Sequence, residues 1–324
     1  MRLADASVLV IGGAGFIGSH LVDLLVDRGV KRLSVVDTLW LGREENLASA
    51  RRRRPDLVFY KEDAADYFAL RAIFVAERLD LVFNLATRPL SYSFTHPRGA
   101  YMTSVDIAVN LAELLREQHF GRLVHFSTSE VYGDAITVPM TEDHPLHPTT
   151  SYAAGKLAAD VLLQSYVEMF KVPVLTVRPF NNYGPRQNSG DYAAVIPITI
   201  RRIASGLPPI VEGSGEQTRD FTYVRDTVRL AADLCECEAA WGGTFNVARA
   251  DEVRIGELIA TIGAIMGCAS PAERRPLRPA DHRRHLAATD RARSLIAFDD
   301  LTPLEVGLAE TIAWYTESLN QRAR

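Results

Sequence analysis

Tyr152 and Lys156 are the two residues whose types and spacing most directly suggest chemistry. They are four residues apart, so on a helix the phenol and the ammonium share one face. A tyrosine with a reference pKa of roughly 10 is a poor base, but a neighbouring ammonium favours the phenolate. The same spacing occurs on solvated helix faces that do no chemistry. The pair therefore predicts a proton acceptor only if a suitable site lies beside it.

A second reactive segment is Ser127-Thr128-Ser129-Glu130, which follows the apolar run Leu123–Phe126. If that run is a strand of a parallel sheet, the hydroxyls emerge at its carboxyl edge, where ligands bind in open sheets. A hydroxyl there can share the proton of an alcohol with Tyr152. Hydride transfer by itself needs no carboxylate, whereas the removal of a proton beside a carbonyl group needs a base. Glu130 therefore indicates that a proton-transfer step follows the hydride transfer. Its alternative role is a cap or structural acid.

The glycine-rich segment Gly12–Gly18 predicts a dinucleotide site. Gly13, Gly15 and Gly18 have the spacing of the dinucleotide fingerprint, between the apolar run Val8–Ile11 and a helical stretch over Ser19–Arg28. Glycines let the backbone approach phosphates, and the helix N-terminus supplies free N–H groups. A tight strand–helix turn without a ligand is the alternative.

Two acidic residues fit the rest of such a ligand. Asp37 ends the next strand-like run about 20 residues on, where a carboxylate accepts hydrogen bonds from the adenosine ribose. The same carboxylate would repel a 2′-phosphate, so we expect NAD rather than NADP. Asp63, just past the third strand, could accept a hydrogen bond from the adenine amino group or could be a helix N-cap.

The elements that must position these residues alternate along the first half of the chain. Short β-branched runs are separated by amphipathic stretches such as Tyr101–Gln118 and Ser151–Phe170. This predicts an α/β fold with a Rossmann doubly wound parallel sheet. We expect residues 1–180 to form the nucleotide domain, with 221–248 returning to it. Residues 181–220 and 249–324 should form a smaller, interleaved substrate-binding lobe, helical from Asp251 onward.

Composition narrows the possible partners. The 324 residues are 47% hydrophobic and 23% charged with a formal net charge of −4, which gives no reason to expect nucleic acid or an anionic membrane surface. Three cysteines are too few for a disulfide framework or a four-ligand zinc site, and we expect no metal. No apolar run approaches the roughly 18 residues of a membrane span, and no signal peptide is evident, so we expect a cytoplasmic protein.

Over nearly its full length the chain resembles the extended short-chain dehydrogenase/reductases that act on nucleotide sugars. The resemblance rests on several motifs in order along the chain: Gly12–Gly18, Val36-Asp37, Asn84-Leu85-Ala86, Ser127–Gly133, Tyr152–Lys156, Arg178–Arg186, Gly215–Phe221 and Arg278–Arg284.

The resemblance implies roles for individual residues. Thr128 and Tyr152 would contact the sugar 4-hydroxyl, with Tyr152 as the base and Lys156 as its electrostatic partner and ribose ligand. Further expected cofactor contacts are Gly12, Gly15, Phe16, Ile17, Gly18 and Ala86. Expected contacts to the sugar or the nucleotide diphosphate are Arg88, Ser129, Asn181, Arg186, Arg219, Arg283 and His285. The resemblance also implies a homodimer through the helices near Tyr101–Gln118 and Ser151–Phe170.

The implied roles of Tyr152 and Thr128 lead to oxidation of the sugar at C4. The motifs constrain less strongly which reaction follows that oxidation. A 4-epimerase needs little beyond Thr128 and Tyr152, so Glu130 argues against it. The 4,6-dehydratases that the site resembles carry an adjacent Asp-Glu pair where this chain has Ser129-Glu130. The Thr-Ser-Glu motif resembles UDP-glucuronate decarboxylases and also GDP-mannose dehydratases, but the Gly215–Phe221 segment looks more like the UDP-sugar branch. We therefore expect UDP-glucuronate decarboxylation, giving UDP-4-keto-pentose, UDP-xylose or both.

Two features qualify this expectation. Decarboxylases of this family usually place an arginine where this chain has His285, which leaves Arg88 as a possible partner for the sugar carboxylate, unless it is merely a surface loop residue. A non-enzymatic NAD sensor or scaffold on the same fold is a different class of protein. The presence of Thr128, Tyr152 and Lys156 argues against it.

Overall fold

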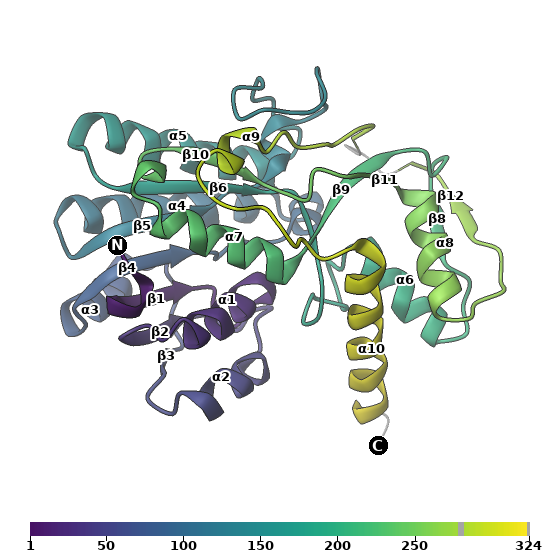
Figure 1. Ribbon diagram of the computed structural model, residues 1–324, viewed down its shortest axis with the longest axis horizontal. Coiled ribbons are helices and arrows are strands. Elements are labelled where there is room, and N and C mark those ends of the chain that lie inside the picture. Colours follow the sequence, from purple (N-terminus) through teal and green to yellow (C-terminus); the bar gives the residue numbers. More distant parts are fainter. Residues whose placement is uncertain (278–281, 323–324) are drawn as a thin grey trace.

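The computed structural model describes residues 1–277 and 282–322 and confirms the predicted α/β sheet (Figure 1). Seven parallel strands lie in the order β10-β6-β5-β4-β1-β2-β3. Their bounds are β1 Ser7–Ile11, β2 Arg32–Val36, β3 Val58–Tyr60, β4 Leu79–Asn84, β5 Phe120–Phe126, β6 Val174–Pro179 and β10 Thr244–Val247. The late strand β10 pairs with β6, so this part of the second half rejoins the sheet.

Helices cover both faces of this sheet, because the strands are apolar on both sides. In β1, Val8 and Val10 pack with one core cluster, whereas Leu9 and Ile11 pack with another. The first cluster includes residues of α1 (Phe16–Asp27) and α7 (Val224–Glu236). The second includes residues of α3 (Tyr67–Ala76), α4 (Pro97–Arg116) and α5 (Ser151–Phe170). The short helix α2 (Ala48–Arg53) packs beside α1.

A second group of elements forms its own apolar core beside the sheet's carboxyl edge (Figure 1). Two small sheets belong to it, β11-β9-β7 and β12-β8. The bounds of its elements are β7 Asn181–Tyr183, α6 Val195–Ala204, β8 Ile210–Glu212, β9 Thr218–Tyr223, β11 Glu252–Arg254, α8 Ile255–Ile265, β12 Glu273–Arg275 and α10 Leu304–Arg322. The expectation of a wholly helical segment after Asp251 is therefore wrong, because β11 and β12 pair with β9 and β8.

Residues 282–294, which we call the strap, lead back from this lobe to the main sheet and include α9 (Asp290–Arg293). Main-chain hydrogen bonds join Met140 to Leu286 and Ala288, so the strap lies against the loop that follows β5. No helix within the described part of the chain is long and apolar enough to cross a membrane.

Candidate active site

A cavity of about 860 Å³ lies between the carboxyl edge of the main sheet and the second lobe. It is the place where an open α/β sheet binds its ligands. The fold brings most of the predicted site residues to its wall: Gly12, Gly15, Phe16, Ile17, Gly18, Asp37, Asp63, Ala86, Arg88, Thr128, Ser129, Glu130, Tyr152, Lys156, Asn181, Arg186 and Arg219.

The glycine loop after β1 has no room for a side chain at two of its positions, Gly12 and Gly18. Gly12 has a φ of +79°, and a Cβ there would lie 2.8 Å from the main-chain nitrogen of Ala86. A Cβ on Gly18 would lie 2.1 Å from the carbonyl oxygen of Gly12. Among the described residues, no side chain caps the N-terminus of α1, so its first N–H groups can receive an anion. The loop therefore fits the pyrophosphate of a dinucleotide.

Asp37 lies at the carboxyl end of β2, as an adenosine-ribose ligand requires. Its carboxylate accepts hydrogen bonds from the main-chain N–H groups of Ala14 (3.0 Å) and Leu39 (2.8 Å). Burial raises its pKa, although these hydrogen bonds work in the opposite direction. Asp63 also lines the cavity and accepts from Ala65 N–H at 2.9 Å, so it does not cap α3; that cap is Asp66.

Tyr152 and Lys156 lie on the first turns of α5, which begins after the N-cap Thr150. The Lys156 ammonium is buried and donates a hydrogen bond of 2.8 Å to the carbonyl oxygen of Phe126. Burial lowers its pKa to about 8, against the charge of Asp160. Burial also raises the pKa of Tyr152 to about 12, although its hydrogen bond with Thr128 opposes that shift. The protein's own groups thus keep the phenol protonated.

Glu130 contacts a residue to which the sequence analysis gave no role. Thr128 caps the short helix η4 (Ser129–Tyr132), and the Glu130 carboxylate oxygen lies 3.0 Å from His282 Nε2. Burial acts to raise the pKa of Glu130, but the hydrogen bond and charge of His282 outweigh it and hold this pKa below its ordinary value. The other ring nitrogen, Nδ1, lies 3.3 Å from Asp134 Oδ1. The two partners are 152 residues apart, so no local pattern could have paired them.

Two predicted ligands, Arg283 and His285, are not among the residues that line the cavity. The Arg283 side chain is exposed, and its main-chain N–H donates to Asp134 at 3.0 Å. His285 is buried, contacts the carbonyl oxygen of Gly133 at 3.1 Å and stacks on His282 at 4.9 Å. Residues 278–281 of the Arg278–Arg284 motif lie outside the described residues.

Three polar side chains of the second lobe face the cavity from β7, the loop that follows it and β9. Within the described chain, Asn181 Nδ2 and Arg186 Nη1 are buried and have no hydrogen-bond partner. The other end of the Arg186 guanidinium pairs with Asp23 at 2.7 Å. Arg219 is buried and donates to the carbonyl oxygens of Thr218 and His282, both at 2.8 Å. Unsatisfied buried donors favour a ligand rich in acceptor oxygens.

Arg88 is held by aromatic rings. Its guanidinium lies 4.1 Å from the ring centre of Trp40, which stacks on Tyr192 at 5.7 Å. Because Trp40 follows β2 and Tyr192 precedes α6, this contact joins the two lobes across the cavity. Arg88 is therefore not a free surface residue, and its role toward an anionic sugar stays a prediction.

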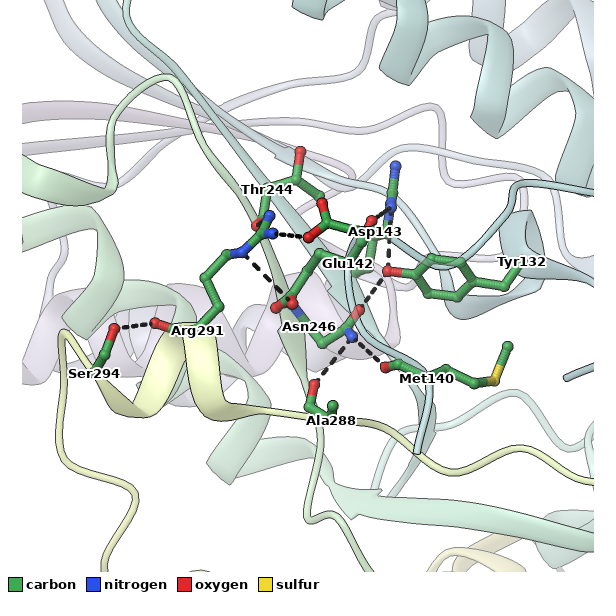
Figure 2. Close-up of polar contacts among 10 residues, drawn as sticks. Tyr132, Met140, Glu142, Asp143, Thr244, Asn246, Ala288, Arg291 and Ser294 are labelled. Carbon is green, nitrogen blue, oxygen red and sulfur yellow. Dashed lines mark hydrogen bonds and ion pairs between the residues drawn. The ribbon is translucent and has the colours of Figure 1, made fainter. Parts of the chain in front are cut away.

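A buried polar network fixes the strap relative to η4 (Figure 2). The Tyr132 hydroxyl donates to Asn246 Oδ1 at 2.7 Å, and Asn246 Nδ2 donates to the carbonyl oxygens of Met140 (2.9 Å) and Ala288 (3.1 Å). A single side chain on β10 thus binds the helix that carries Glu130, the loop after it and the strap. This network sets the position from which His282 meets Glu130.

The dinucleotide loop, Asp37, the Tyr152–Lys156 pair and Thr128 line one cavity, an arrangement that fits an NAD-dependent enzyme. The family model described as NAD dependent epimerase/dehydratase family matches residues 8–248. The chain belongs to that family, and NAD is its cofactor.

Relatives in this family catalyse different reactions. The chain is 33% identical over 309 residues to UDP-glucose 4-epimerase of Mycolicibacterium smegmatis, covering 95% of this chain and 97% of the relative. It is 33% identical over 321 residues to dTDP-glucose 4,6-dehydratase of Actinoplanes sp., with 95% and 97% covered. It is 28% identical to UDP-glucuronic acid decarboxylase 1 of Danio rerio, with 98% and 74% covered.

A solved structure agrees with these relationships. DesIV, a dTDP-glucose 4,6-dehydratase from Streptomyces venezuelae with NAD bound, superposes with a TM-score of 0.90 at 26% identity, covering 97% of this chain and 98% of that one.

Proposed function

We propose that this enzyme oxidises C4 of a nucleotide sugar and then eliminates water across C5 and C6, as a nucleotide-sugar 4,6-dehydratase. The observation that carries the proposal is the contact between Glu130 and His282, 3.0 Å apart beside Tyr152 and Thr128. Elimination needs a base for the C5 proton and an acid for the C6 hydroxyl. The strand end holds one acid, Glu130, where the related dehydratases carry two, but the strap supplies His282 as a second group that can carry a proton.

The nucleotide diphosphate is the chemical class that the second lobe fits. Asn181 Nδ2 and Arg186 Nη1 are buried donor atoms with no hydrogen-bond partner among the described residues, and Arg219 adds a fixed positive charge on the same wall. Guanidinium groups bind diphosphate oxygens in a bidentate manner and remain charged at all relevant pH values. The relatives that act on UDP-sugars and dTDP-sugars support this substrate class.

The first half of the reaction uses residues of β5, η4 and α5. The glycine loop, Asp37 and Lys156 would hold NAD, which when bound would accept the C4 hydride and return it to C6, and whose cationic ring would favour the Tyr152 phenolate. Tyr152 takes the proton of the C4 hydroxyl, and Thr128, hydrogen-bonded to Tyr152, orients that hydroxyl. Lys156 stabilises the phenolate through its buried charge.

The second half begins at Glu130, which the contact with His282 keeps ionised. The 4-ketone makes the C5 proton acidic, and the Glu130 carboxylate removes it. The electrons of the C5–H bond form the enolate and then the C5–C6 double bond as the C6 hydroxyl leaves with a proton. One water is lost, and the sugar becomes a 4-keto-6-deoxy sugar when the hydride that left C4 is returned to C6 and a proton is added to C5.

UDP-glucuronate decarboxylation, which the Thr128-Ser129-Glu130 motif favours, is the second candidate. A 4-keto uronate is a β-keto acid and loses CO2 without a base. His282 is the observation in favour of this candidate, because its charged ring could face the C6 carboxylate. Against it, an ionised Glu130 in the same place would repel that carboxylate.

Product masses decide between these reactions. The enzyme is incubated with UDP-glucose, dTDP-glucose and UDP-glucuronate: loss of water supports dehydration, loss of CO2 supports decarboxylation, and an isomer of unchanged mass supports 4-epimerisation.

In Glu130→Gln we expect C4 oxidation to persist while water loss falls by about 100-fold or more. Glu44→Gln, an exposed partner of Arg51, serves as the matched control. Efficient water loss by Glu130→Gln would refute the proposed base.

We also propose that two copies associate through α4 and α5, which pack against each other (Figure 1). Apolar side chains on these helices are exposed, among them Val109 on α4 and Val161 and Met169 on α5. Light scattering should give twice the chain mass, and Val161→Glu should give a monomer of unchanged thermal stability. A wild-type monomer would contradict the proposal.

A further inference from the structure

Glu130, His282 and Asp134 form a continuous line from the cavity to the surface. His282 Nε2 lies 3.0 Å from Glu130, and His282 Nδ1 lies 3.3 Å from Asp134. The side chains of Glu130, His282 and Asp134 are 16%, 4% and 62% exposed, so the line begins in the catalytic cavity and ends in solvent. Ionised carboxylates only accept hydrogen bonds, so His282 Nε2 donates to Glu130, and the second carboxylate beside Nδ1 favours the doubly protonated, cationic ring.

The backbone of the strap holds the imidazole in this orientation from both sides. Arg219 donates to the carbonyl oxygen of His282, and Asp134 accepts from the next N–H, that of Arg283. The carbonyl oxygen of Arg283 accepts from the main-chain N–H of Thr218 at 3.0 Å. The ring also stacks on His285 with an interplanar angle of 6°. Hydrogen bonds therefore fix the peptide units on both sides of His282, as is expected where the direction of the ring matters for function.

We infer that His282 is a proton relay between Glu130 and solvent, with Asp134 as its outer end. The inference rests on the proposed function, because it names the group that lets protons enter and leave the site during the steps after C4 oxidation.

The proton balance of the relay is simple. When Glu130 has taken the C5 proton, that proton passes to the leaving C6 hydroxyl and departs as part of water. The proton that later restores the C5–H bond comes from His282 Nε2 through Glu130. That leaves a neutral ring with its proton on Nδ1; once the ring changes to the Nε2–H tautomer, Nδ1 accepts a proton from water at Asp134 and the imidazolium is restored. Tyr152 releases the C4 proton to solvent, so no net charge accumulates, and the new C5 hydrogen comes from solvent.

The charged and titratable groups around His282 are compatible with this role. Burial acts to lower the pKa of His282, but Glu130 and Asp134 outweigh it and raise this pKa, while Arg219 acts against them. Burial lowers the pKa of the stacked His285 to about 4, so that ring stays neutral and does not share the proton. Among the described neighbours, the two carboxylates are therefore the groups that hold the charge on His282.

The first test runs the reaction in D2O with the nucleotide sugar that the wild-type enzyme converts. We expect wild-type product with one deuterium at C5. In His282→Gln, which keeps a hydrogen-bond donor near Glu130, reduced-nicotinamide absorbance should still form on mixing, while product formation falls by about 100-fold. Asp134→Asn keeps the oxygen that accepts from Arg283 N–H but removes the charge, and we expect a fall of about 10-fold.

A control variant and a measurement without substrate test the relay independently of the proposed function. Arg284→Gln breaks an exposed ion pair with Glu252 on the same strap and should behave as wild type. Without any substrate, an NMR pH titration of the His282 ring should show a lower pKa in Glu130→Gln than in wild type. If wild type loses water from the sugar but His282→Gln is equally fast, the relay is wrong and the proposed function stands. If wild type forms no dehydrated product, the titration still decides: an unchanged His282 pKa in Glu130→Gln overturns the relay.

Discussion

Arg178 Nη2 lies 3.0 Å from Asp160 Oδ2 in a buried ion pair beneath the catalytic strand end. Both side chains are about 6% exposed, and the same Asp160 oxygen accepts from the Ser127 hydroxyl at 2.8 Å. Arg178 also donates to the Tyr132 hydroxyl at 3.1 Å. This pair therefore connects the start of the Ser127–Glu130 segment to β6 and α5.

Breaking that pair should destabilise the fold strongly. Asp160→Asn leaves the Arg178 charge buried without its counter-charge, which costs about 3–5 kcal/mol of unfolding free energy. Chemical denaturation at neutral pH measures the loss. The exposed pair between Arg254 and Glu257 is the control, since Glu257→Gln should cost no more than about 0.5 kcal/mol. Similar losses in both variants would show that Asp160 acts as an ordinary polar residue.

The buried ammonium of Lys156 makes stability depend on pH. Its pKa is about 8 in the folded protein, below the ordinary value of 10.5. Between these values the unfolded chain holds the proton and the folded chain does not, so the unfolding free energy rises with pH. Across the window the rise is about 3 kcal/mol.

Denaturant unfolding at about pH 7 and about pH 10 should reveal this rise as the difference between wild type and Lys156→Met. Lys171→Met is the control, because Lys171 is 79% exposed. If Lys156→Met and wild type change equally with pH, the ammonium is not destabilised by burial.

The glycine loop offers a sharp test of the cofactor site. In Gly18→Ala the new methyl group would lie 2.1 Å from the carbonyl oxygen of Gly12, so the loop must shift. We expect NAD affinity to fall by at least about 10-fold, or roughly 1.4 kcal/mol. Gly29→Ala is the control: unlike Gly18, Gly29 has a positive φ, which adds backbone strain, but no described atom lies within 4 Å of its added Cβ. Equal NAD affinity in both variants, measured by calorimetry, would place the pyrophosphate elsewhere.

Tyr152 should govern only the first half of the reaction. Tyr152→Phe removes the hydroxyl that accepts the C4 proton, and we expect the formation of reduced-nicotinamide absorbance to slow by about 100-fold or more. Nucleotide-sugar affinity should change little, because the groups assigned to the diphosphate are Asn181, Arg186 and Arg219. Stopped-flow absorbance and calorimetry measure the two effects. Rapid C4 oxidation by Tyr152→Phe would mean that another base takes the proton.

The sequence by itself determined the main sheet and the part of the site that consists of the glycine loop and the Tyr152–Lys156 pair. Alternating apolar runs and amphipathic stretches predicted the strands, and the helix over Ser151–Phe170 has the predicted bounds. The glycine spacing and the Tyr152–Lys156 spacing are local patterns, because each depends on one turn or one helix. Local patterns can be recognised without knowing the tertiary structure.

Only the tertiary structure decided what lies opposite Glu130. The strap crosses from the second lobe to the loop after β5, and it brings His282 within hydrogen-bond distance over 152 residues of chain. The same path leaves Arg283 exposed and directs His285 to the carbonyl oxygen of Gly133. Side-chain direction along such an irregular segment has no fixed period, so three residues of one motif separate: His282 contacts Glu130, Arg283 is exposed, and His285 is buried. That separation depends on the hydrogen bonds of Arg219 and Asn246 to backbone carbonyl oxygens and on the strap's main-chain hydrogen bonds, which join residues far apart in the sequence.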